Sequence, residues 1–329
     1  MSSHPAKIDV HHHFVPDFYR SLVNGKNPDG WPIPSWAPET STTSMSKLGT
    51  STSILSLTSP GTETIPDQKG ARDLARQVNE YASQLVRSSP KTFGFFAALP
   101  SLLDTEGALS EICYAFDELH ADGVTLFTRY GDGDSAAYLG NPVFAPIWKE
   151  LNRRSAVVFI HPTRPGFPNQ LVNPHLTSPM IDFTFETTKT AVDLIVTNTK
   201  RNNPNCKIIL SHAGGTLPFI ASRIEGIAVS AYPEGFPKSP EQVIEEARSF
   251  YYDVALSQSH RVLRCLLDFA PVEHILFGSD FPYAPDKTIE SFAQQLEGFK
   301  IDDKTREKIY RTNALELFPR LREGKGSQL

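Results

Sequence analysis

The sequence predicts an α/β protein built as one (β/α)8 TIM barrel, with a Pro- and Trp-rich insert after the first strand. Short runs of β-branched and aromatic residues alternate with longer stretches of helical spacing, which is typical of repeated β-then-α units. The runs are apolar almost throughout, as in parallel strands that are buried on both faces. A chain of 329 residues is long enough for one large barrel, so residues 1–329 are expected to form a single domain.

Eight runs qualify as strands of this barrel. In chain order they cover residues 7–14, 53–59, 92–99, 123–128, 156–161, 207–212, 250–256 and 274–280. An open, doubly wound sheet is the alternative arrangement of such units. No Gly-x-Gly-x-x-Gly motif follows the first run, so the barrel is favoured.

Several of the stretches between these runs have the spacing of helices: residues 67–88, 182–199, 217–229 and 260–269. The first of them begins with Asp67, and Leu74, Val78 and Tyr81 recur on one face. A final helix over residues 304–318 is expected to close the barrel.

The insert spans about residues 24–45. Its Pro- and Trp-rich part is too irregular for a helix and too aromatic for a merely flexible linker. Because it follows the first strand, it is expected to fold over the end of that strand as a lid. Trp31 and Trp36 are the side chains expected to cover a site there.

Bulk composition excludes several classes of partner. The net charge of −5 and the lack of a basic cluster argue against nucleic acid. No apolar run approaches the ~18 residues of a membrane-spanning helix, and the first residues lack the apolar segment of a signal peptide. Cytoplasm is therefore expected, since Ser327, Gln328 and Leu329 only weakly resemble a Ser-Lys-Leu peroxisomal signal. The three cysteines lie far apart and predict no disulfide framework.

The first predicted strand ends in a candidate metal site. Side chains alternate along a strand, so His11 and His13 are expected on one side and His12 on the other. Two neighbouring imidazoles supply half of a divalent metal site. A His-x-His pair alone is weak evidence, because many such pairs are simply exposed polar residues.

The ends of later strands carry further side chains that can bind a metal. In a barrel the active site lies at the C-terminal ends of the strands, where these residues would meet. His161 ends the fifth predicted strand, His212 the sixth and Asp280 the eighth, whereas Asp253 near the seventh is expected to be structural. Each has an ordinary alternative, such as a capping Asp, but their joint placement favours a metal. Three imidazoles and one carboxylate suit Zn²⁺, with Mn²⁺ as the alternative, and leave one position for water or substrate.

The strand-end residues resemble the set found in the amidohydrolase superfamily. Longer segments resemble the branch that contains aminocarboxymuconate-semialdehyde decarboxylase and related aromatic acid decarboxylases. These segments are residues 8–13, 36–49, 159–162, 211–223, 275–282 and 313–318, which together span nearly the whole chain. Within that branch, residues 30–32 and 55–61 are most similar to fungal 6-methylsalicylate decarboxylase-like proteins.

The resemblance implies a role for each residue of the site. His11, His13, His161 and Asp280 would hold one divalent metal, and His212 would be the acid/base residue beside it. Two-metal relatives carry a carboxylated lysine at the end of the fourth strand. This chain has no lysine there, so one metal is expected.

Arg223 would bind the substrate carboxylate in the site of a neighbouring subunit, in a homodimer or a dimer of dimers. An exposed surface charge is the simpler interpretation of the same residue. The muconate decarboxylases of the branch carry a further Arg in the segment that matches residues 36–45, where this chain has only Ser41, Thr42 and Thr43. The substrate is therefore expected to carry a single carboxylate.

The resemblance thus predicts a metal-dependent, non-oxidative decarboxylase of a small aromatic acid of the salicylate type, such as 6-methylsalicylate. The metal would hold the carboxylate and the ortho oxygen, and Asp280 or His212 would protonate the ring carbon so that CO2 leaves. Trp36 and Phe281 are expected to contact the ring. A metal-dependent hydrolase of a lactone or amide is the alternative, because the superfamily uses the same ligands for that chemistry. A non-catalytic barrel is the third hypothesis, and it would bind no metal.

Overall fold

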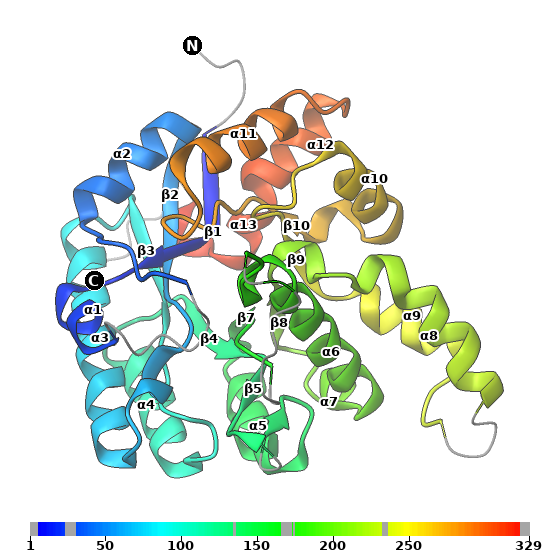
Figure 1. The fold of residues 1–329 in the computed structure, drawn as a ribbon, viewed down its shortest axis with the longest axis horizontal. Helices are drawn as coiled ribbons and strands as arrows, with labels where there is room; N and C mark the ends of the chain where they lie inside the picture. The colour runs from blue at the N-terminus through cyan, green and yellow to red at the C-terminus, as the bar shows by residue number, and fades with distance from the viewer. Residues whose placement is uncertain are drawn as a thin grey trace.

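Eight parallel strands form the centre of the molecule (Figure 1). The structure, a computed structural model, describes residues 6–23, 31–133, 136–165, 173, 175–231 and 236–322. Neighbouring strands pair in the order β1-β2-β3-β4-β7-β8-β9-β10, which is also their order in the chain. They are β1 (Lys7–Phe14), β2 (Thr50–Leu57), β3 (Phe93–Ala97), β4 (Gly123–Phe127), β7 (Val157–His161), β8 (Lys207–Leu210), β9 (Tyr251–Asp253) and β10 (Ile275–Leu276). A short antiparallel pair, β5 (Arg129–Tyr130) and β6 (Ala137–Tyr138), lies outside this sheet.

Backbone hydrogen bonds between the first strand and the segment around the last close the sheet into a barrel. The Val10 amide donates to the Phe277 carbonyl at 3.0 Å, and the Asp280 amide donates to the His11 carbonyl at 2.9 Å. The predicted TIM barrel is therefore confirmed. Its closing seam runs directly beside the predicted metal site.

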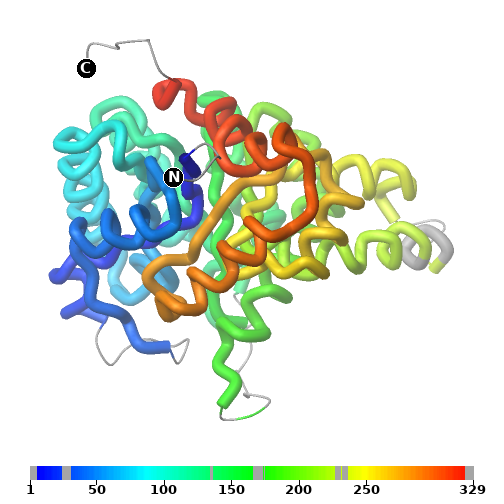
Figure 2. Tube along the Cα trace, turned by 90° about the horizontal axis from the view of Figure 1, so that it is seen from above, coloured from blue at the N-terminus to red at the C-terminus, as the bar shows by residue number. Residues whose placement is uncertain are grey.

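Helices cover the outside of the strands in both views of the fold (Figures 1 and 2). They are α1 (Asp17–Val23), α2 (Pro38–Leu48), α3 (Gln68–Ser88), α4 (Thr105–Asp117), α5 (Ala145–Arg153), α6 (Asp182–Val196), α7 (Thr199–Asn202), α8 (Leu217–Ala231), α9 (Pro240–Arg248), α10 (His260–Phe269), α11 (Asp286–Glu297), α12 (Asp303–Glu307) and α13 (Asn313–Leu317). The neighbouring helices α8 and α9 reach beyond the rest of the barrel (Figure 2). Among the described residues, no helix is both long enough and apolar enough to cross a membrane.

Local sequence signals explain where two of these helices begin. The Asp67 side chain accepts a hydrogen bond from the Gly70 amide and starts α3, as the sequence predicts. The Ser259 side chain caps α10 in the same way, through the amide of Val262. The predicted helix at residues 260–269 coincides with α10.

The last part of the predicted insert is helical, because α2 begins inside it. Pro38 occupies the first turn of α2, and the Ala37 amide donates to Thr40 Oγ1 at 3.1 Å, which together favour a helix start. Residues 24–30 of the insert lie outside the described part of the chain.

The predicted helix at residues 304–318 is divided into α12 and α13 by a π turn at Lys308–Thr312. The Ile309 carbonyl in that turn accepts a hydrogen bond from the Phe277 amide at 3.0 Å. The backbone next to β10 therefore takes an acceptor that a regular helix would have used for itself.

Two apolar layers pack against the strands. The inner layer fills the barrel and consists of Ile8, Val10, Ile54, Phe96, Val157, Phe159, Ile209, Leu276, Ala314, Leu317 and Phe318. Residues of α13 belong to this layer, so α13 closes the end of the barrel at which the strands begin. The larger outer layer lies between strands and helices. Toward the other end, the inner layer reaches the His11 ring, which packs on Phe159 with centroids 4.9 Å apart.

Candidate functional site

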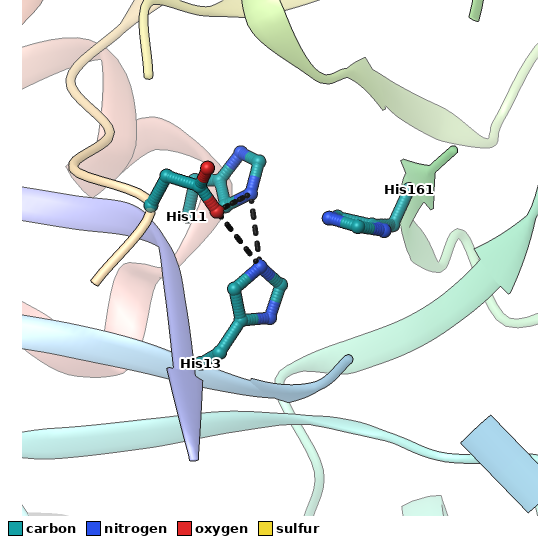
Figure 3. A group of neighbouring side chains, drawn as sticks. His11, His13 and His161 are labelled. Atoms are coloured by element: carbon teal, nitrogen blue, oxygen red, sulfur yellow. Dashed lines mark hydrogen bonds and ion pairs between the residues drawn. The ribbon is translucent and has the colours of Figure 1, made fainter. Parts of the chain in front are cut away.

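Four buried side chains converge where the strands end. The ligating atoms of His11, His13, His161 and Asp280 all lie within 4.8 Å of one another. The Nε2 atoms of His11 and His13 are 3.1 Å apart, and Asp280 Oδ1 is 3.2 Å from each of them. The three histidines point toward a common centre from β1 and β7 (Figure 3). The structure thus brings together the four residues that are expected to hold a metal.

The other ring nitrogen of each histidine is held by an acceptor. Nδ1 of His11 donates to Asp253 Oδ2 at 2.9 Å, and Nδ1 of His161 donates to the Pro162 carbonyl at 2.8 Å. Nδ1 of His13 lies 3.2 Å from the Ser56 carbonyl. A proton fixed on Nδ1 leaves the lone pair on Nε2, which is the atom that faces the centre.

Burial and neighbouring charges set the protonation of the cluster. Burial lowers the pKa of His13 and brings that of His161 well below its usual range, where the neighbouring His13 adds to the effect. Burial also opposes charge on His11, but the Asp253 and Asp280 carboxylates outweigh it and raise the His11 pKa to about 10. Burial opposes charge on Asp280, but its hydrogen bonds to His11 and His13 and the charge on His11 together outweigh burial and hold the Asp280 pKa well below its usual range.

This donor set fits one divalent cation. Three imidazole nitrogens and one carboxylate oxygen are the ligands that Zn²⁺ and related ions prefer, and all four residues are buried. The Nδ1 contacts supply the outer hydrogen bonds that orient ligating histidines in metal sites. A cation at the centre would take the place of the proton that the carboxylates stabilise on His11.

Two residues of the predicted site lie just beyond regular strands, in the left-handed region of backbone conformation. Asp280 has φ 65°, and His212 has φ 54° in the 3-10 turn His212–Gly214 that follows β8. Residues other than glycine adopt this region rarely, and such positions cluster at functional sites. In this conformation the Asp280 side chain joins the four-residue cluster, and both side chains line the cavity.

His212 lies beside the four-residue cluster without belonging to it. Its ring centroid is 4.8 Å from that of His11. Nδ1 lies 3.0 Å from the Ala255 carbonyl, so this nitrogen carries the proton and Nε2 is left without it. His212 also lines the cavity described below. It is therefore placed to exchange a proton with a molecule bound there.

Asp253, at the end of β9, connects a ligand of the cluster with His212. Its Oδ2 accepts from His11 Nδ1, while Oδ1 accepts from the His212 amide at 3.1 Å and the Ala255 amide at 2.9 Å. The sequence interpretation gave Asp253 only a structural role. The available signal was its position near the end of the seventh predicted strand, where the other strands carry site residues.

A cavity of about 540 Å³ opens beside the cluster, within the size range of small-ligand sites. Its described lining is Trp31, Thr58, Ser59, His161, Pro179, Met180, Phe183, Thr184, His212, Leu256, Ser257, Asp280, Tyr283, Ala284, Pro285, Thr288 and Phe292. None of these described residues is Lys or Arg. Trp31 Nε1 donates to the Tyr283 carbonyl at 3.0 Å and so fixes this part of the insert against the cavity wall.

Trp36 and Phe281, which are expected to contact the substrate ring, are not among the described residues that line the cavity. The Trp36 side chain is buried against Phe14, with ring centroids 6.0 Å apart, because it directly precedes α2 and turns into the core with it. Phe281 stacks on His12 with centroids 4.9 Å apart. Trp31, the other aromatic residue expected in the lid, lines the cavity.

Arg223 lies on α8 and is exposed in the single chain. It does not line the cavity of its own chain. This placement agrees with a surface charge and equally with a residue that reaches a second subunit.

Comparisons with known proteins agree with this geometry. A model of the amidohydrolase family matches residues 8–320. The 6-methylsalicylic acid decarboxylase of Penicillium expansum is 46% identical over 319 residues, covering 96% of this chain and 97% of that protein. The decarboxylase yanB of Aspergillus niger is 47% identical over 327 residues, covering 95% of this chain and 88% of that protein. A crystal structure of a dihydroxybenzoic acid decarboxylase from Polaromonas sp. JS666, with manganese and the inhibitor 2-nitroresorcinol, has a TM-score of 0.83 at 26% identity, covering 97% of this chain and 98% of that chain.

Proposed function

This chain belongs to the amidohydrolase family, and from that membership we propose that it is a metal-dependent decarboxylase of a small aromatic acid of the salicylate type. The two fungal relatives described above are named decarboxylases, one of them for 6-methylsalicylic acid. The observation that carries the proposal is the convergence of three imidazoles and one carboxylate beside a cavity with aromatic walls.

In this proposal the chain supplies the metal ligands, and His212 supplies the proton. When bound, the metal provides a fixed positive charge that orients the carboxylate and ortho oxygen of the acid. His212 takes up a second proton on Nε2 from solvent and delivers it to the ring carbon that bears the carboxylate, which returns the imidazole to its neutral form. The new C–H bond forms as the C–C bond breaks, its electron pair stays with the ring, and CO2 leaves. Asp280, the other candidate donor, is assigned to the metal because its Oδ1 lies with the histidine nitrogens.

The cavity wall supports an aromatic acid with one carboxylate. Phe183 and Tyr283 line the cavity and pack edge-on to His161 and His13, with ring centroids 6.0 Å and 5.3 Å apart. An aromatic substrate held at the cluster would thus lie among aromatic side chains. A second carboxylate would have no cationic side chain among the described lining residues to pair with.

A direct assay tests this proposal. The purified, metal-loaded protein is incubated with 6-methylsalicylate, salicylate, dihydroxybenzoates, a pyrimidine carboxylate and simple lactones, and CO2 and ring products are quantified. We expect CO2 from a monocarboxylic acid with an ortho hydroxyl, and none from an analogue that lacks this hydroxyl. Lactone opening without CO2 release would favour the hydrolase instead, and inactivity toward every acid would overturn the decarboxylase.

We propose Zn²⁺ as the native metal, because three imidazoles and one carboxylate match its preferred ligands. A related structure contains manganese, so Mn²⁺ is the competing ion. Elemental analysis of protein purified without added metal tests the identity. A stoichiometric Mn²⁺ content, with no activity after reconstitution with Zn²⁺, would contradict the proposal.

We also propose that the active form is a homodimer in which α8 lies at the interface. Phe219 on α8 is 80% exposed, and Phe185 on the neighbouring helix α6 is 47% exposed. Exposed apolar groups of this kind mark surfaces that a partner covers. Arg223 lies one helical turn beyond Phe219, so a second copy that covers Phe219 would also receive Arg223.

Subunit mixing tests the placement of Arg223. Arg223→Ala and His212→Ala homodimers should each be nearly inactive. If Arg223 serves the neighbouring site, a mixed dimer contains one intact site, and equal mixing should restore about a quarter of the activity. No recovery in mixed dimers would contradict the proposal, as would a monomeric active enzyme in light scattering.

A further inference from the structure

His12 lies in a buried hydrogen-bonded chain that runs from the insert to the backbone beside Asp280. Its Nδ1 lies 3.0 Å from Asp9 Oδ2, and its Nε2 lies 2.9 Å from Ser41 Oγ. The ring is fully buried and stacks on Phe281, with ring planes 29° apart. His12 points away from the metal ligands, as the strand period predicts, yet it occupies a specific polar site of its own.

The hydrogen bonds from Trp36 through Ser41 and His12 to Asp9 are all donated in the same direction. Trp36 Nε1 lies 2.8 Å from Ser41 Oγ, and an indole N–H can only donate. The Ser41 hydroxyl proton is therefore available for His12 Nε2, and the Nδ1 proton of His12 is donated to Asp9. The indole of the insert is thus linked through two side chains to a buried carboxylate.

Asp9 is the acceptor at the end of this chain, and four hydrogen bonds satisfy it. Besides His12 Nδ1, it accepts from the His11 amide at 3.1 Å, from the Ser279 amide at 3.1 Å and from the Ser279 hydroxyl at 2.6 Å. A buried carboxylate is tolerated when bonds of this kind replace water. Three of the four bonds therefore fix the backbone or side chain of residues adjacent to, or within, the metal cluster.

We propose that His12 is a positioning residue for the metal site. It orients the Asp9 carboxylate that holds Ser279, and its ring packs on Phe281, so both neighbours of Asp280 are fixed through it. Asp280 needs such support because its backbone is in the left-handed region, at φ 65°. The inference rests on the proposed function, in which Asp280 binds the metal. Loss of partners that orient metal ligands typically lowers metal affinity about 10–100-fold.

The test measures metal affinity by competition with a chromogenic chelator, on full-length protein whose fold is checked by circular dichroism. His12→Phe keeps the stacked ring but removes both hydrogen bonds, so its Kd for Zn²⁺ or Mn²⁺ should rise about 10–100-fold. The matched control is His274→Phe. His274 stacks on Tyr251 with centroids 4.4 Å apart and lies near a backbone acceptor, but at the opposite end of the barrel. This control should lose stability without loss of metal affinity.

Two shorter replacements separate the halves of the chain and remain informative if His12→Phe does not fold. An Asn amide reaches the position of Nδ1, so His12→Asn keeps the bond to Asp9 and should keep most of the metal affinity. His12→Gln reaches toward Ser41 instead and should lose affinity like His12→Phe. Equal, wild-type-like affinity in folded His12→Phe, or in both His12→Asn and His12→Gln, would overturn the inference alone. A wild-type protein that binds no divalent metal would overturn the proposed function as well.

Discussion

Strand β1 carries buried polar groups toward both of its ends, and the partners of these groups differ between the two ends. At the start, Lys7 is 4% exposed, and its Nζ donates to the Leu48 carbonyl at 2.6 Å and to Glu297 at 2.9 Å. At the other end, His11 and His13 are equally buried, but their Nε2 atoms face each other at 3.1 Å. The Lys7 charge is balanced by a carboxylate of the chain, whereas the ring nitrogens of the histidines converge on a common centre.

The difference shows that burial of polar groups does not by itself identify a functional site. Lys7 Nζ also lies 4.7 Å from the centroid of the Tyr310 ring. All of these partners of the ammonium group belong to the chain itself. At the other end, the converging atoms of the metal-free chain hold a proton on His11, which a divalent cation would displace. The convergence of these atoms therefore distinguishes the end of β1 that could hold a metal ion from the end at Lys7.

Removing one of the predicted metal ligands should abolish metal binding at the histidine end of β1, which is the largest expected effect. His13→Ala deletes one of the four converging groups, so the purified protein should lose its metal and with it measurable decarboxylation. Metal content and CO2 release are measured on the same preparation. A variant that kept stoichiometric metal and activity would remove His13 from the ligand set.

Removing the proton donor should leave metal binding intact. His212→Ala is expected to lower kcat about 10²–10⁴-fold, because a positioned general acid contributes that much. Metal content should not change, since His212 is outside the four-residue cluster. Unchanged turnover would instead favour Asp280 as the proton donor. A parallel loss of metal would instead make His212 a ligand.

The pKa of His11 predicts a proton released on metal binding. In the metal-free protein this pKa is raised from 6.5 to about 10, so His11 carries a proton at pH 7 that a metal must displace. Metal affinity should rise up to about tenfold per pH unit between pH 6.5 and about 10. The stability that protonated His11 gives the metal-free protein is complete below pH 6.5 and is lost as the pH rises toward about 10.

Isothermal titration of metal into the protein, in buffers of different ionisation enthalpy, measures this release. We expect about one proton per metal at pH 7. A heat that does not depend on the buffer would contradict the raised pKa of His11.

Replacing Lys7 tests the other end of β1, and it should have the smallest effect, confined to stability. Lys7→Met keeps the length of the side chain but removes two hydrogen bonds, one of them to the half-exposed Glu297. The free energy of unfolding should fall by about 1–3 kcal/mol. Metal affinity and kcat should stay at wild-type values. A fall in metal affinity would show that the two ends of β1 are coupled.

The convergence of His11, His13, His161 and Asp280 could be predicted from sequence because barrel topology brings strand ends together. His161 and Asp280 are far apart in the chain, yet each follows an apolar run, and parallel runs end on the same rim. The roles of Trp36 and Phe281 could not be predicted this way. An aromatic residue near the site can pack in the core or line the cavity, and only the tertiary packing decides which of the two it does.

The sequence by itself determined the barrel, the residues at its rim and the alternation that separates His12 from its two neighbours. Only the tertiary structure decided which side of β1 faces inward. Ile8 and Val10 belong to the inner layer, so strict alternation from them would turn His12 inward instead of His11. The pairing of β1 with β2 shifts register between Asp9 and His12.

The physical reason for this shift is a bond within the chain itself. The His11 amide donates to the Asp9 side chain, so it is withdrawn from regular pairing with the next strand. His11 therefore follows Val10 toward the inside, where its ring packs on Phe159. A side-chain acceptor that competes with the sheet cannot be recognised from residue spacing, because it acts only once Ser279 and the closing strand hold Asp9 in place.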